Sequence, residues 1–207
     1  MTAATRLWPV TLEHDRLRLR PLRRRDLAAW NDVQLRNREW LRPWEATSPD
    51  GGASPSFAQR VSGLRRQARE GRAVPLGVEV DGRLAGQVTV SLIAWGAYRS
   101  GRVGYWIDQA LVGQGHVPCA VALVVDHCFD AGLNRVEVNI RPENVPSLAV
   151  VRKLGLREEG LRRRLLHIDG AWRDHLSFAV TADEVPEGLH ERLHGGRGDA
   201  ATGPPAR

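Results

Sequence analysis

Alternating apolar and polar residues predict several strands in the first half of the chain. Residues 16–20 alternate strictly and are typical of a half-buried strand. Residues 76–80 alternate as well, and the Asp81-Gly82 pair that follows favours a two-residue hairpin turn. We therefore expect a return strand over residues 83–94 and a further strand over residues 102–108.

Four segments have patterns typical of helices. Residues 26–38 carry apolar side chains at helical spacing, and residues 56–70 form a second candidate. Residues 117–129 are almost entirely apolar, so this helix is expected to pack on most sides against a sheet. A fourth, short helix is expected to begin after Asn144, a good N-cap residue, and to end at Gly155.

The order of these elements predicts the fold class. A strand over residues 135–140 follows the apolar helix at once, so strand, helix and strand form a parallel pair with a right-handed crossover. Residues 161–168 and 171–180 form a second hairpin across Asp169-Gly170. The sequence thus predicts a mixed α/β fold with one mixed sheet of six or seven strands and about four flanking helices.

A length of 207 residues fits one domain. Residues 1–13 form a lead-in without a core pattern, and residues 14–185 hold all the predicted elements. Residues 186–207 are rich in Gly, Arg and Pro, so we expect this segment to be a disordered tail.

Composition points to a cytoplasmic protein that does not enter a membrane. No apolar run reaches the roughly 18 residues that a membrane span needs, and the N-terminus lacks the apolar core of a secretory signal. The formal net charge is +6. The basic runs Arg23-Arg24-Arg25 and Arg162-Arg163-Arg164 have no interleaved aromatic residues that would stack on bases, so nucleic-acid binding is not expected.

The cysteines and histidines predict neither a disulfide nor a metal site. Cys119 and Cys128 are nine residues apart in a predicted helix. That spacing puts them on opposite faces, about 13 Å apart along the axis, which is too far for a disulfide. The seven histidines are scattered along the chain, and we expect no metal.

A glycine-rich turn before the apolar helix is the first candidate for chemistry. Gly113 and Gly115 flank Gln114 between a strand and the start of a helix. Backbone N–H groups at such a turn, together with the positive end of the helix, can hold a pyrophosphate. Taken alone, the same three residues more commonly form a plain tight turn.

Several motifs in a fixed order make the chain similar to a known family. The motifs are Gly104 to Asp108, Gly113-Gln114-Gly115, Asn134 to Glu137, Pro142 to Ser147, and Lys153 to Leu156. In this order they resemble the GNAT superfamily of N-acetyltransferases. The segments Leu41 to Glu45 and Gly170 to His175 narrow the resemblance to the RimJ/RimL type, which acetylates N-termini of ribosomal proteins.

The resemblance implies binding roles for particular residues. The backbone of Tyr105, Trp106 and Ile107 would bind the pantetheine arm of acetyl-CoA, and Asn144 would contact it as well. The pyrophosphate would bind to the amides of residues 113–118. Within that segment the candidates are Gly113, Gln114, Gly115, His116 and Val117. The chain departs from the family pattern at Val112, Val117 and Pro118, and Pro118 removes one N–H group from the cradle.

The resemblance also implies catalytic candidates. Ser147 would lie near the thioester sulfur. Glu159 holds the position of a base in RimL-like enzymes, and Glu137 is the rival base; direct deprotonation through water is the third alternative. A tyrosine acid that a related branch uses has Val151 at its place here.

Trp44, Glu45 and Tyr98 are candidates for the wall that receives the amine. The expected reaction is acetyl transfer from acetyl-CoA to a primary amine, with a protein N-terminus as one acceptor. Alternatives within the same reaction are a longer acyl-CoA as donor or a small-molecule amine as acceptor. A further alternative is a non-catalytic module that binds acyl-CoA or associates with the ribosome. A monomer and a homodimer are both compatible with the sequence.

Overall fold

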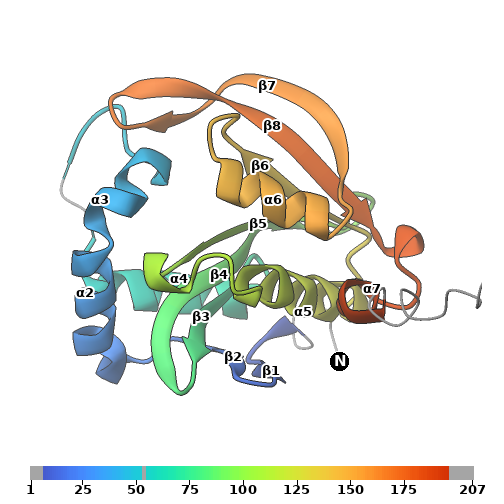
Figure 1. Cartoon of the computed structure of the whole chain (residues 1–207), viewed down its shortest axis with the longest axis horizontal. Coiled ribbons are helices and arrows are strands. Elements are labelled where there is room, and N and C mark those ends of the chain that lie inside the picture. Colours follow the sequence, from blue (N-terminus) through green and yellow to red (C-terminus); the bar gives the residue numbers. More distant parts are fainter. Residues whose placement is uncertain (1–6, 53–54, 196–207) are drawn as a thin grey trace, which may run out of the picture.

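One mixed sheet of eight strands organises the computed structural model, which describes residues 7–52 and 55–195 (Figure 1). Across the sheet the strands lie in the order β1 (Leu12–His14), β2 (Leu17–Arg20), β3 (Val74–Val80), β4 (Arg83–Ala94), β5 (Ser100–Ile107), β6 (Arg135–Ile140), β8 (Ala171–Thr181) and β7 (Arg157–Ile168). Among neighbours, β5 and β6 are parallel and the other pairs are antiparallel. The predicted fold class is confirmed.

Six helices surround the sheet in the described part of the chain. They are α2 (Leu27–Arg36), α3 (Arg38–Leu41), α4 (Phe57–Arg69), α5 (His116–Asp130), α6 (Val145–Lys153) and α7 (Leu189–Gly195). The helices cover both faces of the sheet, as two adjacent residues of β4 show. Leu84 packs in a cluster with Trp30 of α2 and Phe57 of α4, whereas Ala85 belongs to the cluster that contains α5. Successive strand residues point to opposite faces, so α2 and α4 lie opposite α5.

The apolar helix α5 forms the centre of the main core, as its composition predicts. Eight of its residues are buried, including Cys119 and Cys128, and both cysteines are free. In Figure 1, α5 crosses the sheet beside α6 and α7. α5 packs against β4 and β5 of the sheet.

β5 and β6 pair over only a short stretch. Their partners are Ser100 with Arg135, Gly101 with Val136, and Arg102 with Glu137. Both strands continue beyond these pairs, so their later residues face an opening in the sheet instead of each other. Backbone groups of β5 on this side are available to a ligand because no neighbouring strand uses them.

Both ends of the described chain are more ordered than the sequence predicts. Leu7 is fully buried and β1 adds a strand to the sheet, within the segment expected to be a lead-in. The expectation of a disordered tail is wrong for residues 189–195, which form α7; residues 196–207 lie outside the described part. Leu189 is fully buried, and the Asp126 carboxylate accepts hydrogen bonds from the backbone N–H groups of Leu189 and His190 at 2.6 and 2.8 Å. Tertiary contacts of this kind leave no periodic pattern in so short a segment.

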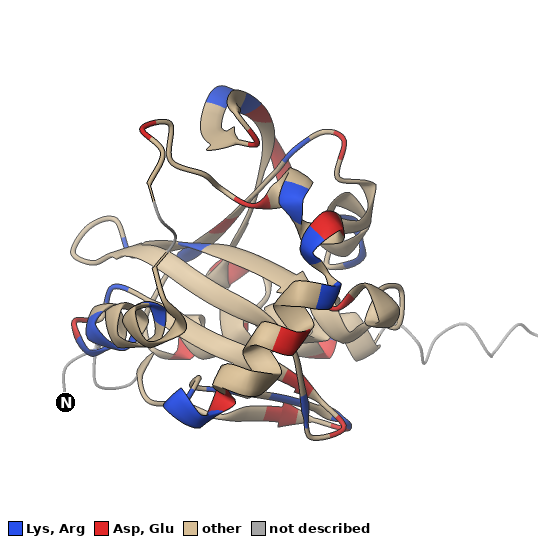
Figure 2. Cartoon of the chain, turned by 90° about the vertical axis from the view of Figure 1, so that its left-hand side faces the viewer, with Lys and Arg blue, Asp and Glu red and all other residues tan. Residues whose placement is uncertain are grey.

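Charged residues lie mainly on helices, turns and strand ends, with acidic and basic positions interspersed (Figure 2). The middle of the sheet is largely uncharged in the same view. Within residues 7–52 and 55–195, every helix is too short or too polar to cross a bilayer.

Candidate active site

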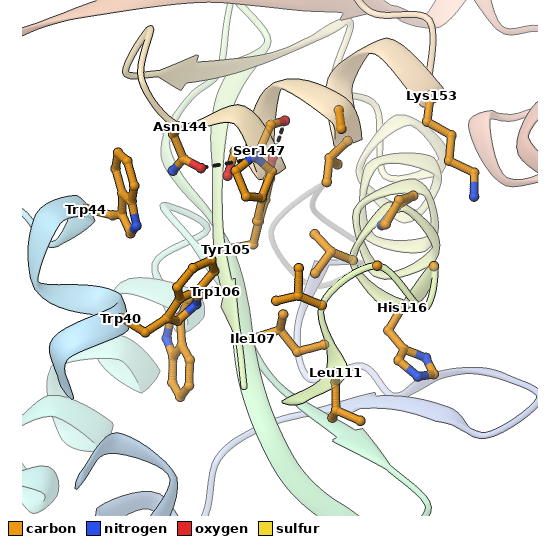
Figure 3. A pocket seen from close by; sticks show the side chains of 18 of the residues that line it. Trp40, Trp44, Tyr105, Trp106, Ile107, Leu111, His116, Asn144, Ser147 and Lys153 are labelled. Atoms are coloured by element: carbon orange, nitrogen blue, oxygen red, sulfur yellow. Dashed lines mark hydrogen bonds between the residues drawn. The ribbon is translucent and has the colours of Figure 1, made fainter. Parts of the chain in front are cut away.

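A cleft of about 280 Å³ lies where β5 and β6 separate (Figure 3). Its walls come from the end of β5, the loop and first turn of α5, one face of α6, and the segment from Trp40 to Trp44. The sequence-predicted residues that line it are Tyr105, Trp106, Ile107, Gly113, Gly115, His116, Val117, Asn144 and Ser147. Elements far apart in sequence thus bring most of the expected binding residues to one place.

The loop before α5 has the geometry of an anion site. Gly113 and Gly115 have φ values of 82° and 87°, a left-handed conformation that favours glycine. Gly115 is the N-cap, and the first bond of the helix runs from the N–H of Cys119 to its carbonyl at 3.3 Å. Earlier N–H groups of the turn have no partner within the helix. Pro118 therefore costs no helical bond, although it offers no N–H to a ligand.

Gln114 differs from its neighbours in the loop. Its side chain is exposed and donates a hydrogen bond to the carbonyl of Ala110 at 3.0 Å. Unlike Gly113 and Gly115, it does not line the cleft. Any contribution of Gln114 to binding would come from its backbone alone.

Lys153 is a binding candidate to which the sequence motif Lys153–Leu156 assigned no role. It lines the cleft from the last turn of α6. Its Nζ lies 4.0 Å from the position that a Cβ atom on Gly115 would take, so the ammonium stands beside the glycine loop (Figure 3). It is also the only lysine in the chain. A cation next to unpaired N–H groups strengthens the attraction for a phosphate.

Hydrogen bonds tie β5 to the first turn of α6. The hydroxyl of Tyr105 donates to the carbonyl of Ser147 at 3.4 Å, and the N–H of Ser147 donates to Oδ1 of Asn144 at 3.2 Å. Burial raises the pKa of Tyr105, so its hydroxyl stays protonated. Asn144 is the N-cap of α6, as predicted, and Val151 is fully buried inside the core.

Two further cavities meet the cleft around Trp44 and Tyr105, which line all three. One, of about 900 Å³, lies beside β4 and β5 and is also lined by Glu45. The other, of about 260 Å³, lies between the separated strands and is also lined by Asn139 and His175. The tip of the β7–β8 hairpin joins the loop after Trp44, where the N–H of Thr47 donates to the carbonyl of His167 at 2.9 Å.

Of the three acceptor-side candidates, two line a cavity and one does not. Trp44 and Glu45 line the 900 Å³ cavity, and the guanidinium of Arg141 stacks over the Trp44 ring at 5.4 Å. Tyr98 is 66% exposed in the turn between β4 and β5 and lines none of the three cavities. The structure therefore gives no contact between Tyr98 and the site.

Glu159 does not reach the site, contrary to its expected role. Its carboxylate pairs with Arg135, and Nη2 of Arg157 lies 3.0 Å from its Oε1. The hydrogen bond from Arg135 is the main reason why its pKa falls to about 2. A carboxylate with so low a pKa is a weak proton acceptor, and it lines none of the three cavities.

Glu137 is likewise committed to arginines. It is 7% exposed and accepts from Nε of Arg135 at 3.1 Å and from Nη2 of Arg162 at 3.0 Å. It is absent from the lining of all three cavities. Both predicted carboxylate bases are thus ion-pair partners at the closed end of the β5–β6 opening.

His175 is the proton acceptor that the geometry favours. It is 3% exposed on β8 and lines the cavity between the separated strands. Its Nδ1 lies 3.0 Å from the carbonyl oxygen of Arg173, which can only accept, so Nδ1 carries the proton and Nε2 keeps a lone pair. Burial lowers the pKa of His175, and the charges of Arg141 and Arg102 lower it further. His175 is therefore neutral near pH 7.

Asn139 adds unused polar capacity to the same cavity. Both polar atoms of its amide are buried, and neither has a hydrogen-bond partner among the described residues. A buried amide without a partner is costly, and such groups are common where a ligand completes them. From the sequence, only carboxylates were candidate bases and His175 was one residue of the Gly170–His175 motif, so neither Asn139 nor His175 was assigned a role.

The chain matches a known family over most of its sheet. Residues 16–157 match the family described as "Acetyltransferase (GNAT) domain". Among curated proteins, the "[Ribosomal protein uS5]-alanine N-acetyltransferase" of Escherichia coli (strain K12) is 28% identical over 183 residues, which cover 86% of this chain and 94% of that protein. "Probable N-acetyltransferase YjcK" of Bacillus subtilis (strain 168) is 39% identical over 101 residues, which span 48% of this chain and 56% of that relative.

A solved structure shows the same architecture. "Mycobacterium smegmatis RimJ in complex with CoA-disulfide" superposes with a TM-score of 0.87 at 42% identity and covers 92% of this chain and 96% of that one. Together with the family match, this similarity confirms the predicted fold and the family resemblance. The chain belongs to the GNAT family of acetyltransferases.

Proposed function

We propose that this acetyltransferase transfers the acetyl group of acetyl-CoA to the N-terminal amine of a ribosomal protein. The observation that carries the proposal is the junction at Tyr105 and Trp44. There a cleft that ends at an anion site meets a larger cavity on the other side of β5. The names of the E. coli and M. smegmatis relatives support the cosubstrate and the acceptor class.

The residues of the cleft fit acetyl-CoA. The N–H groups of the Gly113–Gly115 turn and the ammonium of Lys153 would bind its phosphates. Backbone groups of Tyr105 to Ile107 that point away from β4 have no partner in β6 and would bind the pantetheine amides. Asn144 would lie beside the pantetheine arm. The thioester supplies an activated acyl group, whose C–S bond breaks as the C–N bond of the product forms.

His175 would accept the proton that the amine loses, because it lines the cavity between the strands and its Nε2 keeps a lone pair. Ser147, at the start of α6, would donate a hydrogen bond toward the sulfur that leaves. Glu45 is the one acidic residue that lines any of the three cavities in the described part of the chain. It would attract the ammonium form of the incoming N-terminus.

The acceptor class can be tested with purified protein, acetyl-CoA and a panel of amines, with CoA release as the measurement. The panel contains peptides that match ribosomal-protein N-termini, the same peptides with a formylated N-terminus but a free lysine, and small polyamines. We expect release with the free N-termini only. Release with polyamines alone would replace the protein acceptor by a small molecule, and no release with any amine would overturn the proposed activity.

Removing the cation beside the glycine loop should weaken acetyl-CoA binding. We expect Lys153→Met to raise KM for acetyl-CoA by about tenfold with little change in kcat, because a charge-assisted contact of about 1.5 kcal/mol is lost. Arg152→Met removes the same charge from the neighbouring exposed position and should leave KM within about twofold. Steady-state kinetics at two salt concentrations measure both effects. Equal KM values for the two variants would exclude Lys153 from the phosphate site.

A further inference from the structure

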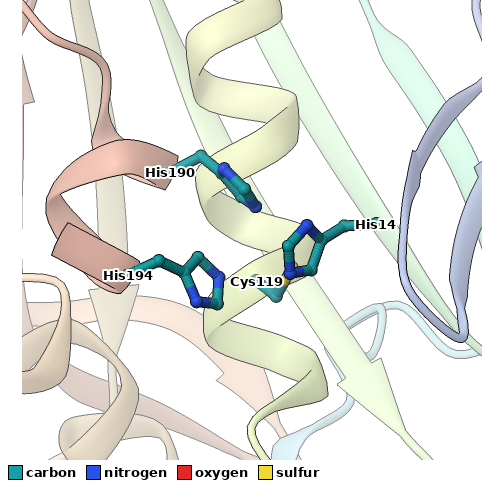
Figure 4. Close-up of side chains that lie close together, drawn as sticks. All are labelled: His14, Cys119, His190 and His194. Atoms are coloured by element: carbon teal, nitrogen blue, oxygen red, sulfur yellow. The ribbon is translucent and has the colours of Figure 1, made fainter. Parts of the chain in front are cut away.

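Four side chains with metal-binding atoms meet on the side of α5 near α7 and β1 (Figure 4). They are His14 of β1, Cys119 of α5, and His190 and His194 of α7. One ligand atom from each lies within 4.8 Å of the others. Cys119 is not among the residues that line the acetyl-CoA cleft, and none of the four takes part in the proposed reaction.

The expectation of no metal came from histidines that are scattered along the sequence, and it overlooked that His190 and His194 are four residues apart. That spacing gains its meaning from α7, because residues four apart in a helix lie on one face. His190 and His194 therefore project together toward α5, where the Asp126 carboxylate holds the first turn of α7 by two hydrogen bonds.

The three imidazole rings form a compact cluster. Their centroids are 4.5 Å apart for His14 and His190, 4.6 Å for His14 and His194, and 4.6 Å for His190 and His194. Nε2 of His190 is buried and has no hydrogen-bond partner among the described residues. Burying such a nitrogen without a partner is unfavourable, and a metal ion would satisfy it.

We propose that His14, Cys119, His190 and His194 together bind one Zn²⁺ ion. A thiolate and three imidazoles are ligands that zinc prefers, whereas Mg²⁺ and Ca²⁺ require oxygen ligands. Tetrahedral zinc places its ligand atoms about 3.3–3.8 Å apart, so each atom here needs to move inward by about 1 Å or less. Oδ2 of Asp15 lies 3.3 Å from Nε2 of His14 and adds a negative charge beside the cation.

The ligand set defines the role of the ion. Four protein ligands leave no open position for a substrate, so the site is structural. The ion would join the first strand, the last described helix and α5. Cys119 follows the Gly113–Gly115 turn by one helical turn, so the ion would also hold the start of α5 in place. Binding of Zn²⁺ does not depend on the proposed acetyl transfer.

The test is a titration of the metal-free full-length protein with Zn²⁺ in competition with a chromophoric chelator. We expect one equivalent to bind with a Kd below about 1 µM. Co²⁺ used in place of Zn²⁺ should give the visible bands of a tetrahedral site and a near-ultraviolet thiolate band. Cys119→Ser and His190→Gln should each weaken Zn²⁺ binding by about 100-fold or more and change the Co²⁺ spectrum.

Two matched controls replace the same residue types outside the cluster. Cys128→Ser and His167→Gln should leave Zn²⁺ affinity unchanged, because neither side chain belongs to the cluster. Thermal unfolding provides a second measurement: Zn²⁺ should raise Tm of the wild type and of both controls, but not of His190→Gln. If Cys119→Ser fails to fold, His190→Gln still decides the result. No stoichiometric Zn²⁺ binding by the wild type, or equal affinity in His190→Gln, would overturn the proposal.

Discussion

Replacing His175 with glutamine should lower kcat by about 100- to 1,000-fold, because the neutral imidazole is the group best placed to accept the proton of the amine. Glutamine keeps a polar side chain of similar length but cannot take up a proton. KM for acetyl-CoA should change little, since His175 does not line the acetyl-CoA cleft. Steady-state kinetics with a free N-terminal peptide measure both constants.

The pH dependence of kcat provides an independent measurement of the same assignment. The active form of His175 is neutral, so activity is lost as the pH falls through its pKa. Burial lowers this pKa below the ordinary value of 6.5, and kcat should therefore persist at pH 6.5 and fall only in more acidic solution. In His175→Gln this acid limb should disappear from what activity remains.

Glu159→Gln is the matched control for the proton acceptor. Its carboxylate is held by Arg135 and Arg157 and lines none of the three cavities, so kcat should stay within about twofold of the wild type. Acetyl-CoA binding and Tm of both variants report whether the fold is retained. If kcat fell 100-fold in Glu159→Gln and stayed normal in His175→Gln, then Glu159 and not His175 would be the base.

The cosubstrate side of the site could be predicted because its signals are local in sequence. Gly113 and Gly115 form a left-handed turn, and an apolar helix follows them directly. Asn144 caps the helix that begins at the next residue. Each of these structures depends on only a few neighbouring residues. The binding roles of the β5 residues followed from the family resemblance of the motif Gly104 to Asp108. The sheet has eight strands where six or seven were predicted, mainly because the three residues of β1 are too few for a periodic pattern.

The catalytic side could not be predicted in the same way, because it depends on which strands become neighbours. Strand β8 lies between β6 and β7, and this order brings Arg135 and Arg162 to the two glutamates. The same order puts His175 beside the end of β6, next to Asn139. Pairing across a sheet joins residues about 25 to 40 positions apart, and no short motif contains that information.

Replacing Gly86 with alanine should destabilise the protein and weaken acetyl-CoA binding together. Gly86 of β4 pairs with Ile107 of β5, and a Cβ atom on Gly86 would lie 2.3 Å from the carbonyl oxygen of Trp106 and 3.0 Å from the Cα of Ile107. These contacts are with backbone, so no side-chain rotation can relieve them. β5 would have to move away from β4 at Trp106 and Ile107, which both line the acetyl-CoA cleft.

The expected cost is a loss of about 2–3 kcal/mol in the free energy of unfolding, or about 5–10 °C in Tm, with a higher KM for acetyl-CoA.

Two other glycines separate this effect from glycine replacement in general. Gly63→Ala lies in α4 with no atom within 4 Å of the new Cβ and should stabilise the helix by up to about 1 kcal/mol. Gly104→Ala, in β5 itself, also meets nothing within 4 Å and should fold normally. If Gly86→Ala is as stable as Gly104→Ala, then β4 and β5 do not approach as closely as described. In that case the backbone of Trp106 and Ile107 is not fixed by β4, and the cleft would owe its shape to α5 and α6 instead.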